Sequence, residues 1–404
     1  MASIEQNRSE SGPRILDDVK VLDFSAVIAG SYCSRMMADL GAEVLKIEGL
    51  GGEILRHAGP MRGKTSALFS AMNSGKRCLT LDLKQERAID ICKQLVVSHD
   101  VVVENFSPGV MKRLGLDYPV LRELNDKLIM CSVSGYGQTG PEAWRPAYAP
   151  IVQATSGYEY VYLRSQVGQT KPLNMGLPIG DTSAAQQAFS AIMAALYHRE
   201  KTGQGQYIDI AMQDILLANM HKDFQTAFLG DMNDRHYGPL ETRDGFVIVV
   251  PLNQHHFEAL TGIIGKPELI DDERFKTTTA RVHNYDFLQN EIEQWTRTQT
   301  CDACIAAFEG NNLPCARYRH VRDLDDDPQL MHRGMLTEIE DAAGPLKVPN
   351  TAFLFSETHA TVGRHVPSLG EHNLQVLRDE LGMDGDTIAA LERDGVIGTI
   401  AEDS

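Results

Sequence analysis

Short apolar runs alternate with helical patterns between residues 19 and 136, and this alternation constrains the fold of the 404-residue chain more than any other feature. The runs predicted to be strands lie at 19–25, 42–48, 77–83, 100–106 and 127–136. Helical spacing is found at 31–41 and 85–98. Apolar strands separated by helices are typical of parallel strands joined by crossover helices. The sequence therefore predicts a doubly wound, Rossmann-like α/β layer.

The turn after the first predicted strand, DFSAVIAGSYCS, lacks the G-x-G-x-x-G spacing of dinucleotide-binding sheets. A nicotinamide-dependent dehydrogenase therefore has no support. Open α/β sheets bind ligands beyond the carboxyl ends of their strands. We expect a ligand at the loops that follow Ser25, Leu83, Val103 and Val133.

The length of the chain is typical of about two domains. A helix at 182–200, a strand at 207–212 and a helix at 213–229 continue the first domain. The polar, turn-rich stretch 230–245 then precedes a strand at 246–252 and several helices up to about residue 340. We interpret this part as a second, smaller domain. The tail at 367–397 is predicted to form two helices.

Charge and hydropathy exclude several kinds of partner. Asp and Glu number 55 against 38 Lys and Arg, and the net charge of -17 disfavours nucleic acid and anionic membranes. No stretch approaches the roughly 20 apolar residues of a membrane helix. The start, MASIEQNRSESGPR, lacks the order of a secretory signal. We predict a cytoplasmic protein without a nucleic-acid or membrane partner.

The seven cysteines have no regular spacing, which indicates reduced thiols. Cys301, Cys304, Cys315 and His320 are residue types that bind zinc. The segment TCDACIAAFEG is equally typical of an amphipathic helix with buried thiols. We therefore predict no metal site.

Asp181 is an isolated acid before a helix rich in small residues, in the stretch NMGLPIGDTSAAQQAFSAIMAAL. Between Lys127 and Gly180 the only carboxylates are Glu142 and Glu159. Asp is a favoured N-cap, so a purely structural role is one interpretation. A helix N-terminus also favours the ionised form, and an ionised carboxylate in a dry site can act as a nucleophile. A catalytic role is therefore the other interpretation.

The order of motifs resembles the class III CoA-transferases, the CaiB/BaiF family, over nearly the whole chain and most clearly in residues 19–215. The resemblance is carried by these segments: VKVLDFSAVIAGSYCSRMMADLGAEVLKIEGLGGE, NSGKRCLTLDLK, VVVENFSPGVMKRLGL, SVSGYGQTGP, YAPIVQATSG, GDTSAAQQAFSAIMAALYHREKTGQGQYIDIAMQD and PSLGEHNLQVL.

This resemblance implies a Rossmann-like large domain made from both chain ends, 1–228 and 346–404, with a small α+β domain, 229–345, inserted between them. It also implies a homodimer of two ring-like subunits threaded through each other. In that family the acid at the position of Asp181 is the nucleophile. It attacks an acyl-CoA thioester to give a mixed anhydride, and then carries CoA as an aspartyl thioester before an acceptor carboxylic acid takes it.

CoA is then a substrate carrier, and no cofactor is bound permanently. The resemblance places CoA along nine residues, of which Lys84, Arg113 and Arg145 can meet phosphates and Phe106 can border the adenine. The other five are Val27, Ala29, Leu81, Asn105 and Tyr148. The basic residues could also be solvated charges at helix ends.

Two positions depart from the family pattern. Ala149 stands where many family members have an acid, and Ile28 stands where the formyl-CoA enzymes have a glutamine. Both positions border the acyl pocket in the family, so the resemblance does not extend to the formyl/oxalyl substrate pair, and the acyl group is not given by the sequence. An α-methylacyl-CoA racemase is one alternative, but it needs a histidine before the aspartate, and none lies between His99 and His198. A CoA-binding protein without turnover, in which Asp181 only caps a helix, is another.

Overall fold

The computed structural model describes residues 13–164, 166, 168–229 and 237–398, so part of the polar stretch 230–245 lies outside the described residues. Two compact units are present. The large unit falls within Met1–Tyr160, Leu173–Met220 and Pro328–Ser404, and the small unit within Val161–Pro172 and His221–Asp327. The large unit is therefore assembled from three separate stretches of the chain.

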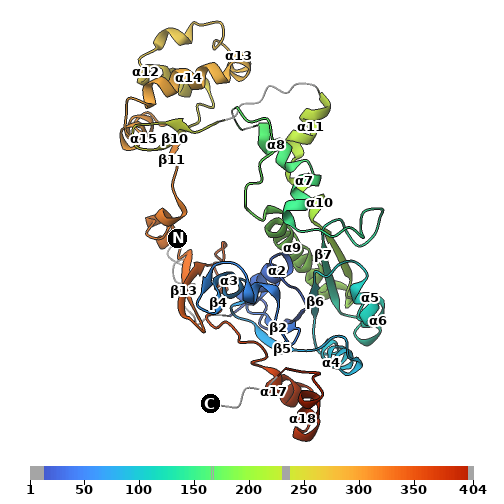
Figure 1. Ribbon diagram of the computed structural model, residues 1–404. Helices are drawn as coiled ribbons and strands as arrows, with labels where there is room; N and C mark the ends of the chain where they lie inside the picture. Colours follow the sequence, from blue (N-terminus) through green and yellow to red (C-terminus); the bar gives the residue numbers. More distant parts are fainter. Residues whose placement is uncertain (1–12, 165, 167, 230–236, 399–404) are drawn as a thin grey trace. The chain divides into compact units, whose positions relative to one another are not determined.

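A six-stranded parallel sheet with the order β5-β2-β1-β6-β7-β8 forms the centre of the large unit (Figure 1). Its strands are β1 (Lys20–Asp23), β2 (Glu43–Glu48), β5 (Arg77–Thr80), β6 (Val101–Glu104), β7 (Ile129–Ser134) and β8 (Tyr207–Ala211). From β1 the chain adds β2 and β5 on one side, and from β6 it adds β7 and β8 on the other side. The strand order therefore reverses between the neighbours β1 and β6. This confirms the predicted doubly wound α/β layer, and such reversal points are where open sheets bind ligands.

Alternate strand positions enter two separate cores, one on each face of the sheet. Val101 and Val103 pack with α2 and α9, whereas Val102 packs with α4 and α18. Helices of the first core are α2 (Ala29–Asp39), α7 (Ala149–Thr155), α9 (Ile179–Thr202) and α10 (Met212–Asn219). Helices of the second core are α4 (Glu86–Val96), α6 (Tyr118–Leu124) and α18 (Gly385–Arg393). The continuous apolar runs of the sequence follow from this burial on both faces.

The C-terminal stretch completes the edge of the sheet beside β5. Asn373 Oδ1 accepts the N–H of Thr80 at 2.9 Å, and Asn373 Nδ2 donates to Thr80 Oγ1 at 2.8 Å. The short helix α17 (Asn373–Gln375) continues as a π-helix that places Val376 and Leu377 in the second core. Both ends of the chain therefore contribute to the large unit.

The hairpin of β12 (Leu336–Asp341) and β13 (Gly344–Pro349) also belongs to the large unit. Its residues Ile339 and Val348 share a buried cluster with Leu55 and Phe69. This packing places the second division at 327/328, whereas the sequence places it at 345/346. The first division lies at 220/221 and not at the expected 228/229, and the segment 161–172 also belongs to the small unit. The remaining short elements of the large unit are β3 (Met61–Arg62), β4 (Thr65–Ser66), α3 (Ala67–Asn73), α5 (Val110–Leu114), which packs in the second core, and α16 (Pro328–His332).

The small unit combines a three-stranded antiparallel sheet with helices. Phe257, Phe275 and Phe308 are wholly buried in its core. Its strands are β9 (Leu240–Glu241), β10 (Phe246–Val249) and β11 (Cys315–Arg317), in the order β11-β10-β9. Its helices are α11 (His221–Leu229), α12 (Gln254–Ile263), α13 (Thr278–His283), α14 (Tyr285–Thr296) and α15 (Cys301–Glu309). Helix α8 (Tyr158–Arg164) runs from the large unit into this one.

Two predicted helices are wrong in detail. The helix expected at 213–229 is two helices, α10 and α11, because the backbone of Met220 is not helical, with φ −106° and ψ 33°. In the tail, α18 is present as predicted, but the first expected helix is one α-turn that continues as a π-helix. Among the described helices, none is long and apolar enough to cross a membrane.

Candidate active site

The loops after β1 and β6 are joined at the point where the strand order reverses. Asn105 Oδ1 accepts the N–H of Ala26 at 2.9 Å, and Asn105 Nδ2 donates to the carbonyl of Ala26 at 2.8 Å. One side chain therefore fixes both backbone groups of a residue in the neighbouring loop. Gly30 permits the tight turn into α2, because a Cβ there would lie 2.3 Å from the Cβ of Ser25.

A cavity of about 420 Å³ lies at these loops, and we call it the Asp181 cavity. It brings together seven of the ten predicted site residues, which are Val27, Ala29, Asn105, Phe106, Arg145, Tyr148 and Asp181. Its remaining lining residues are Ala26, Glu53, Ile54, Ser107, Pro108, Val133, Ser134, Gly135, Ala147 and Met212. The loops expected to hold a ligand after Ser25, Val103 and Val133 thus all contribute to one cavity.

A second cavity of about 350 Å³, the Leu81 cavity, lies at the ends of β1, β2 and β5. It contains two further predicted residues, Leu81 and Lys84. Phe106, Glu53 and Ala26 line both cavities, so the two share a wall. The two cavities are therefore adjacent, with Phe106 between them.

The three predicted phosphate-binding cations differ in their surroundings. Lys84 lies at the rim of the Leu81 cavity, and Arg113 lies on α5 outside the lining of either cavity. Neither side chain has an ion-pair partner among the described residues. Arg145 lines the Asp181 cavity, is paired with Glu142, and lies over the ring of Tyr136 at 5.5 Å from its centroid. That ion pair is exposed and so costs little to exchange for a phosphate.

Asp181 is the third residue of α9, and the residue at the N-cap is Pro178, which makes no capping hydrogen bond. The interpretation of Asp181 as an N-cap is therefore wrong. Among the described residues, none donates a hydrogen bond to its carboxylate or forms an ion pair with it. Burial raises the pKa of Asp181 from 3.8 to about 6. Burial therefore outweighs any lowering of this pKa by the helix N-terminus, and the carboxylate is ionised above about pH 6.

The start of α9 is fixed from α7, which packs against it. Gln153 is wholly buried on α7, and its Oε1 accepts the N–H of Gly180 at 3.4 Å. Gly180 lies close to α7, since a Cβ there would come within 3.5 Å of Ala149. These contacts hold the backbone immediately before Asp181, so the carboxylate enters the cavity from a supported turn of helix.

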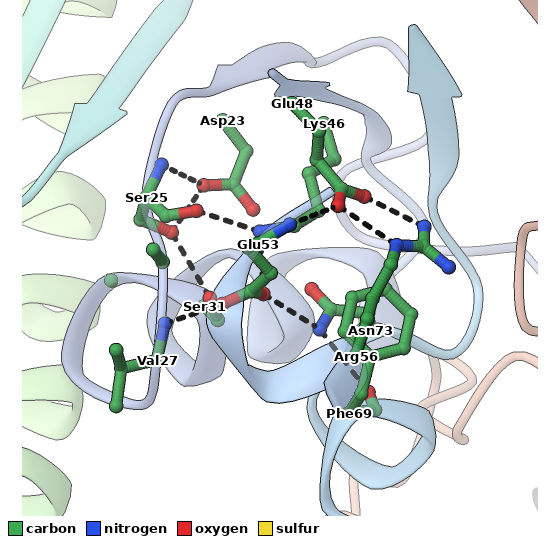
Figure 2. A network of polar contacts seen from close by, with 12 residues as sticks. Asp23, Ser25, Val27, Ser31, Lys46, Glu48, Glu53, Arg56, Phe69 and Asn73 are labelled. Carbon is green, nitrogen blue, oxygen red and sulfur yellow. Dashed lines mark hydrogen bonds and ion pairs between the residues drawn. The ribbon is translucent and has the colours of Figure 1, made fainter. Parts of the chain in front are cut away.

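Buried charges lie beneath the loop after β1 (Figure 2). Asp23 accepts from the ammonium group of Lys76 at 2.9 Å and from Ser34 Oγ at 2.6 Å. The two lysine charges, Lys76 and Lys46, hold the pKa of Asp23 near 2 although burial opposes this. On the other side of the network Arg56 donates to both carboxylate oxygens of Glu48, at 2.7 and 2.8 Å. Of these paired charges, Glu48 lines the Leu81 cavity, and the others lie behind the described lining of the two cavities.

Sequence reasoning missed several residues of the Asp181 cavity. Ser134 ends β7 with a buried hydroxyl that has no hydrogen-bond partner among the described residues. Glu53 lines both cavities, but its segment GLGGE carries only the signal of a turn. Conversely, Ile28 and Ala149, where the chain departs from the family pattern, are not among the described lining residues.

The cysteines considered for zinc lie in the small unit. Cys301 and Cys304 are buried in its core, and Cys301 Sγ lies 3.1 Å from Thr242 Oγ1. No group of His, Cys, Asp and Glu among the described residues is arranged to hold a metal ion.

Comparison with known proteins identifies the family. A model of CoA-transferase family III matches residues 16–373. The chain is 30% identical to a succinyl-CoA:glutarate CoA-transferase of Homo sapiens, covering 95% of this chain and 90% of that protein. It is 34% identical to a succinate–glutarate CoA-transferase of Agrobacterium fabrum, covering 90% of this chain and 95% of that protein.

The same result comes from solved structures. The crystal structure of a CAIB/BAIF family protein from Brucella suis superimposes with a TM-score of 0.79 at 31% identity, covering 91% of this chain and all of that one. The resemblance found in the sequence motifs is thereby confirmed. The chain belongs to CoA-transferase family III, the CaiB/BaiF family, and is an enzyme that moves CoA between acyl-CoA thioesters and carboxylates.

Proposed function

We propose that Asp181 is the nucleophile of this transfer. One observation carries the proposal. Asp181 lines the cavity, and its carboxylate has no hydrogen-bond or ion-pair partner among the described residues. A carboxylate whose pKa is about 6 is ionised at neutral pH, yet is more basic than an ordinary aspartate and so a better nucleophile. Glu53 lines the same cavity, but its carboxylate is engaged by Val27 and Lys46.

The steps balance without any other reactant. A carboxylate oxygen of Asp181 attacks the thioester carbonyl carbon, the C–S bond breaks, and CoA leaves as a thiolate. The thiolate then attacks the carbonyl carbon of Asp181 in the anhydride, which releases the donor carboxylate and leaves an aspartyl-CoA thioester. An acceptor carboxylate reverses these two steps and takes the CoA.

Each of these additions forms an oxyanion that needs hydrogen-bond donors. The hydroxyl of Ser134 is an unused donor in the wall of the cavity. The first amides of α2, which begins at Ala29 in the same wall, are further donors.

CoA is proposed to extend from the Asp181 cavity past Phe106 into the Leu81 cavity. The thioester end then lies at Asp181, and the adenine end lies near Leu81 with Lys84 and Arg113 available to its phosphates. Val27, Ala29, Asn105 and Tyr148 form the wall along the path. CoA acts as a substrate carrier, and the proposal needs no permanently bound group.

The donor and acceptor acids are proposed from the relatives. The two curated relatives above are named for succinate or succinyl-CoA and glutarate. Succinyl-CoA with glutarate is therefore the first pair to assay. The alternative of a racemase has little support, since no histidine is found among the described residues that line the Asp181 cavity.

We also propose an interlocked homodimer. Helix α11 supports it, because none of its residues is buried, and Phe228 and Leu229 are 76% and 77% exposed. Large apolar side chains left this open are typical of an interaction surface.

Mass-spectrometric assay of CoA transfer by Asp181→Asn tests the nucleophile. Asn is nearly the same size, but its amide oxygen is too weak a nucleophile to form the anhydride. The variant is expected to fold and to bind CoA, and to lose transfer completely. Transfer at a near wild-type rate, with deamidation excluded by mass, would leave Asp181 with no role in chemistry.

A further inference from the structure

The turn between β1 and α2 contains a residue in an unfavourable backbone conformation. Val27 has φ +63°, in the left-handed region, and only one other described non-glycine residue, Asn312, has a positive φ. A β-branched side chain is poorly tolerated there, whereas asparagine tolerates it. Such a conformation persists only where surrounding contacts enforce it, and these positions cluster at functional sites. Val27 lies in the wall of the Asp181 cavity.

One carboxylate supplies the contact that enforces it. The N–H of Val27 donates to Glu53 Oε2 at 2.7 Å, as Figure 2 shows. The other oxygen, Glu53 Oε1, lies 3.1 Å from the ammonium group of Lys46 and 3.5 Å from Asn73 Nδ2. The backbone N–H of Glu53 is itself held by Glu48 at 2.9 Å. Glu53 is therefore fixed before it binds the loop.

Lys46 connects the same carboxylate to the start of the loop. Its side chain is fully buried, and its ammonium group donates to the carbonyl of Ser25 at 2.6 Å. Ser25 and Val27 are thus held from one side by the Lys46–Glu53 pair, while Asn105 holds Ala26 from the other. Every residue of the turn before Ile28 has a fixed backbone contact.

We propose that Glu53 is a positioning residue for the CoA site, because it holds Val27 in the left-handed conformation that shapes the cavity wall and aims the first amides of α2. The inference rests on the proposed function, since it takes this wall as the place where CoA binds. It assigns Glu53 no contact with the reacting atoms. The bound form of the loop is preset by the carboxylate, so CoA does not have to order it.

Only an ionised carboxylate can make both contacts. If Gln replaced Glu53 and its oxygen accepted the Val27 N–H, its amide group would face the Lys46 ammonium, and two donors would meet. In the opposite orientation the amide group would face the N–H of Val27. Glu53→Gln therefore loses either the contact with the Val27 N–H or the contact with the Lys46 ammonium group.

The test is a double-mutant cycle between Glu53→Gln and Val27→Gly, read by calorimetric titration with CoA. Glycine adopts a positive φ without steric cost, so the turn of the Val27→Gly variant no longer needs to be forced. Glu53→Gln is expected to weaken CoA binding about tenfold or more in the wild-type background and less than about threefold in the Val27→Gly background. Thermal unfolding of each variant is measured alongside, because the loss of the Lys46 partner lowers stability equally in both backgrounds.

Asp341→Asn is the matched control. Asp341 is a buried carboxylate with an arginine partner, Arg62, and a hydroxyl partner, Ser70, and it lines neither cavity. This variant is expected to lose stability and to keep its affinity for CoA. If Glu53→Gln does not fold, Glu53→Asp replaces it in the cycle, since the shorter side chain keeps the charge but cannot span from Lys46 to Val27.

An equal loss of CoA affinity in both backgrounds would overturn the proposal, because Glu53 would then act on binding independently of Val27. No loss in either background would also overturn it and would leave Glu53 with a role in stability alone. Failure of the nucleophile assignment gives a different pattern. In that case Asp181→Asn retains transfer while the coupling between Glu53 and Val27 is unchanged.

Discussion

The side chain of Asn105 makes two hydrogen bonds to the backbone of Ala26, a residue 79 positions earlier in the chain. The two loops belong to β1 and β6, which are neighbours only because the strand order reverses between them. The side-chain amide of Asn105 thus joins the two loops at the point where the strand order reverses, and Asn105 also lines the cavity that contains Asp181.

Asn105→Asp keeps the acceptor for the Ala26 N–H but replaces the donor with a second oxygen that faces the Ala26 carbonyl. An unmade, partly buried hydrogen bond of this kind costs about 1–3 kcal/mol of folding free energy. We expect a loss of stability in this range and a fall in kcat/KM of about tenfold or more, because the two walls of the site separate. Urea unfolding and transfer assays check this, and unchanged values for both would contradict the role given to the amide.

Asp181→Asn is expected to stabilise the protein at neutral pH. The folded-state pKa is raised above 3.8, so the carboxylate ionises more readily in the unfolded chain and stability is lost as the pH rises from about 4 to 6. A rise from 3.8 to about 6 corresponds to roughly 3 kcal/mol at most, and Asn removes this penalty. The gain in unfolding free energy is therefore full above about pH 6 and fades towards pH 4.

Asp214→Asn serves as the control for this effect, because Asp214 also lies in the first turn of a helix but is exposed. The unfolding free energy of the Asp214→Asn variant is expected to change by less than about 0.5 kcal/mol, both near pH 4 and above pH 6. Destabilisation by Asp181→Asn at pH 8 would contradict the account of a buried, unpartnered carboxylate.

Lys84→Ala and Arg113→Ala are each expected to raise KM for an acyl-CoA about threefold to tenfold and to leave kcat nearly unchanged. Phosphate contacts stabilise the bound substrate and the transition state alike, which is why KM carries the effect. Arg122→Ala is the matched control, since Arg122 is exposed on α6 and lines neither cavity. A fall in kcat at constant KM would show that these cations do not serve as CoA anchors.

The proposed interlocked dimer predicts that the chains stay paired on dilution to the nanomolar range, because threaded rings separate only by unfolding. Mass photometry measures this directly. A monomer population that grows as the protein is diluted under native conditions would rule out interlocking.

Much of the sheet follows from the sequence. The runs at 19–25, 42–48 and 100–106 are strands because both faces of the sheet are covered, which demands continuous apolar stretches. The loops at the carboxyl ends of these strands could be named as the ligand site by the same rule, and most of the predicted residues lie there.

Other features depend on contacts that no local pattern carries. Glu53 acts on Val27, 26 residues earlier, and its segment has only the appearance of a turn. The start of α9 was misplaced by the sequence because glycine rarely begins a helix, whereas Gln153 from α7 holds the N–H of Gly180 in the first turn. The hairpin of β12 and β13 belongs to the large unit because Ile339 and Val348 pack against Leu55 and Phe69, far away in the sequence.

Trapping the covalent intermediate tests the central claim most directly. The wild-type protein is incubated with succinyl-CoA, treated with hydroxylamine and digested, and the peptide that contains Gly180 and Asp181 is analysed by mass spectrometry. The account predicts a hydroxamate on Asp181 that requires the acyl-CoA and is absent from Asp181→Asn. Complete transfer of CoA to an acceptor acid, with the Asp181 peptide unmodified throughout turnover and hydroxamate found on another carboxylate, would contradict it.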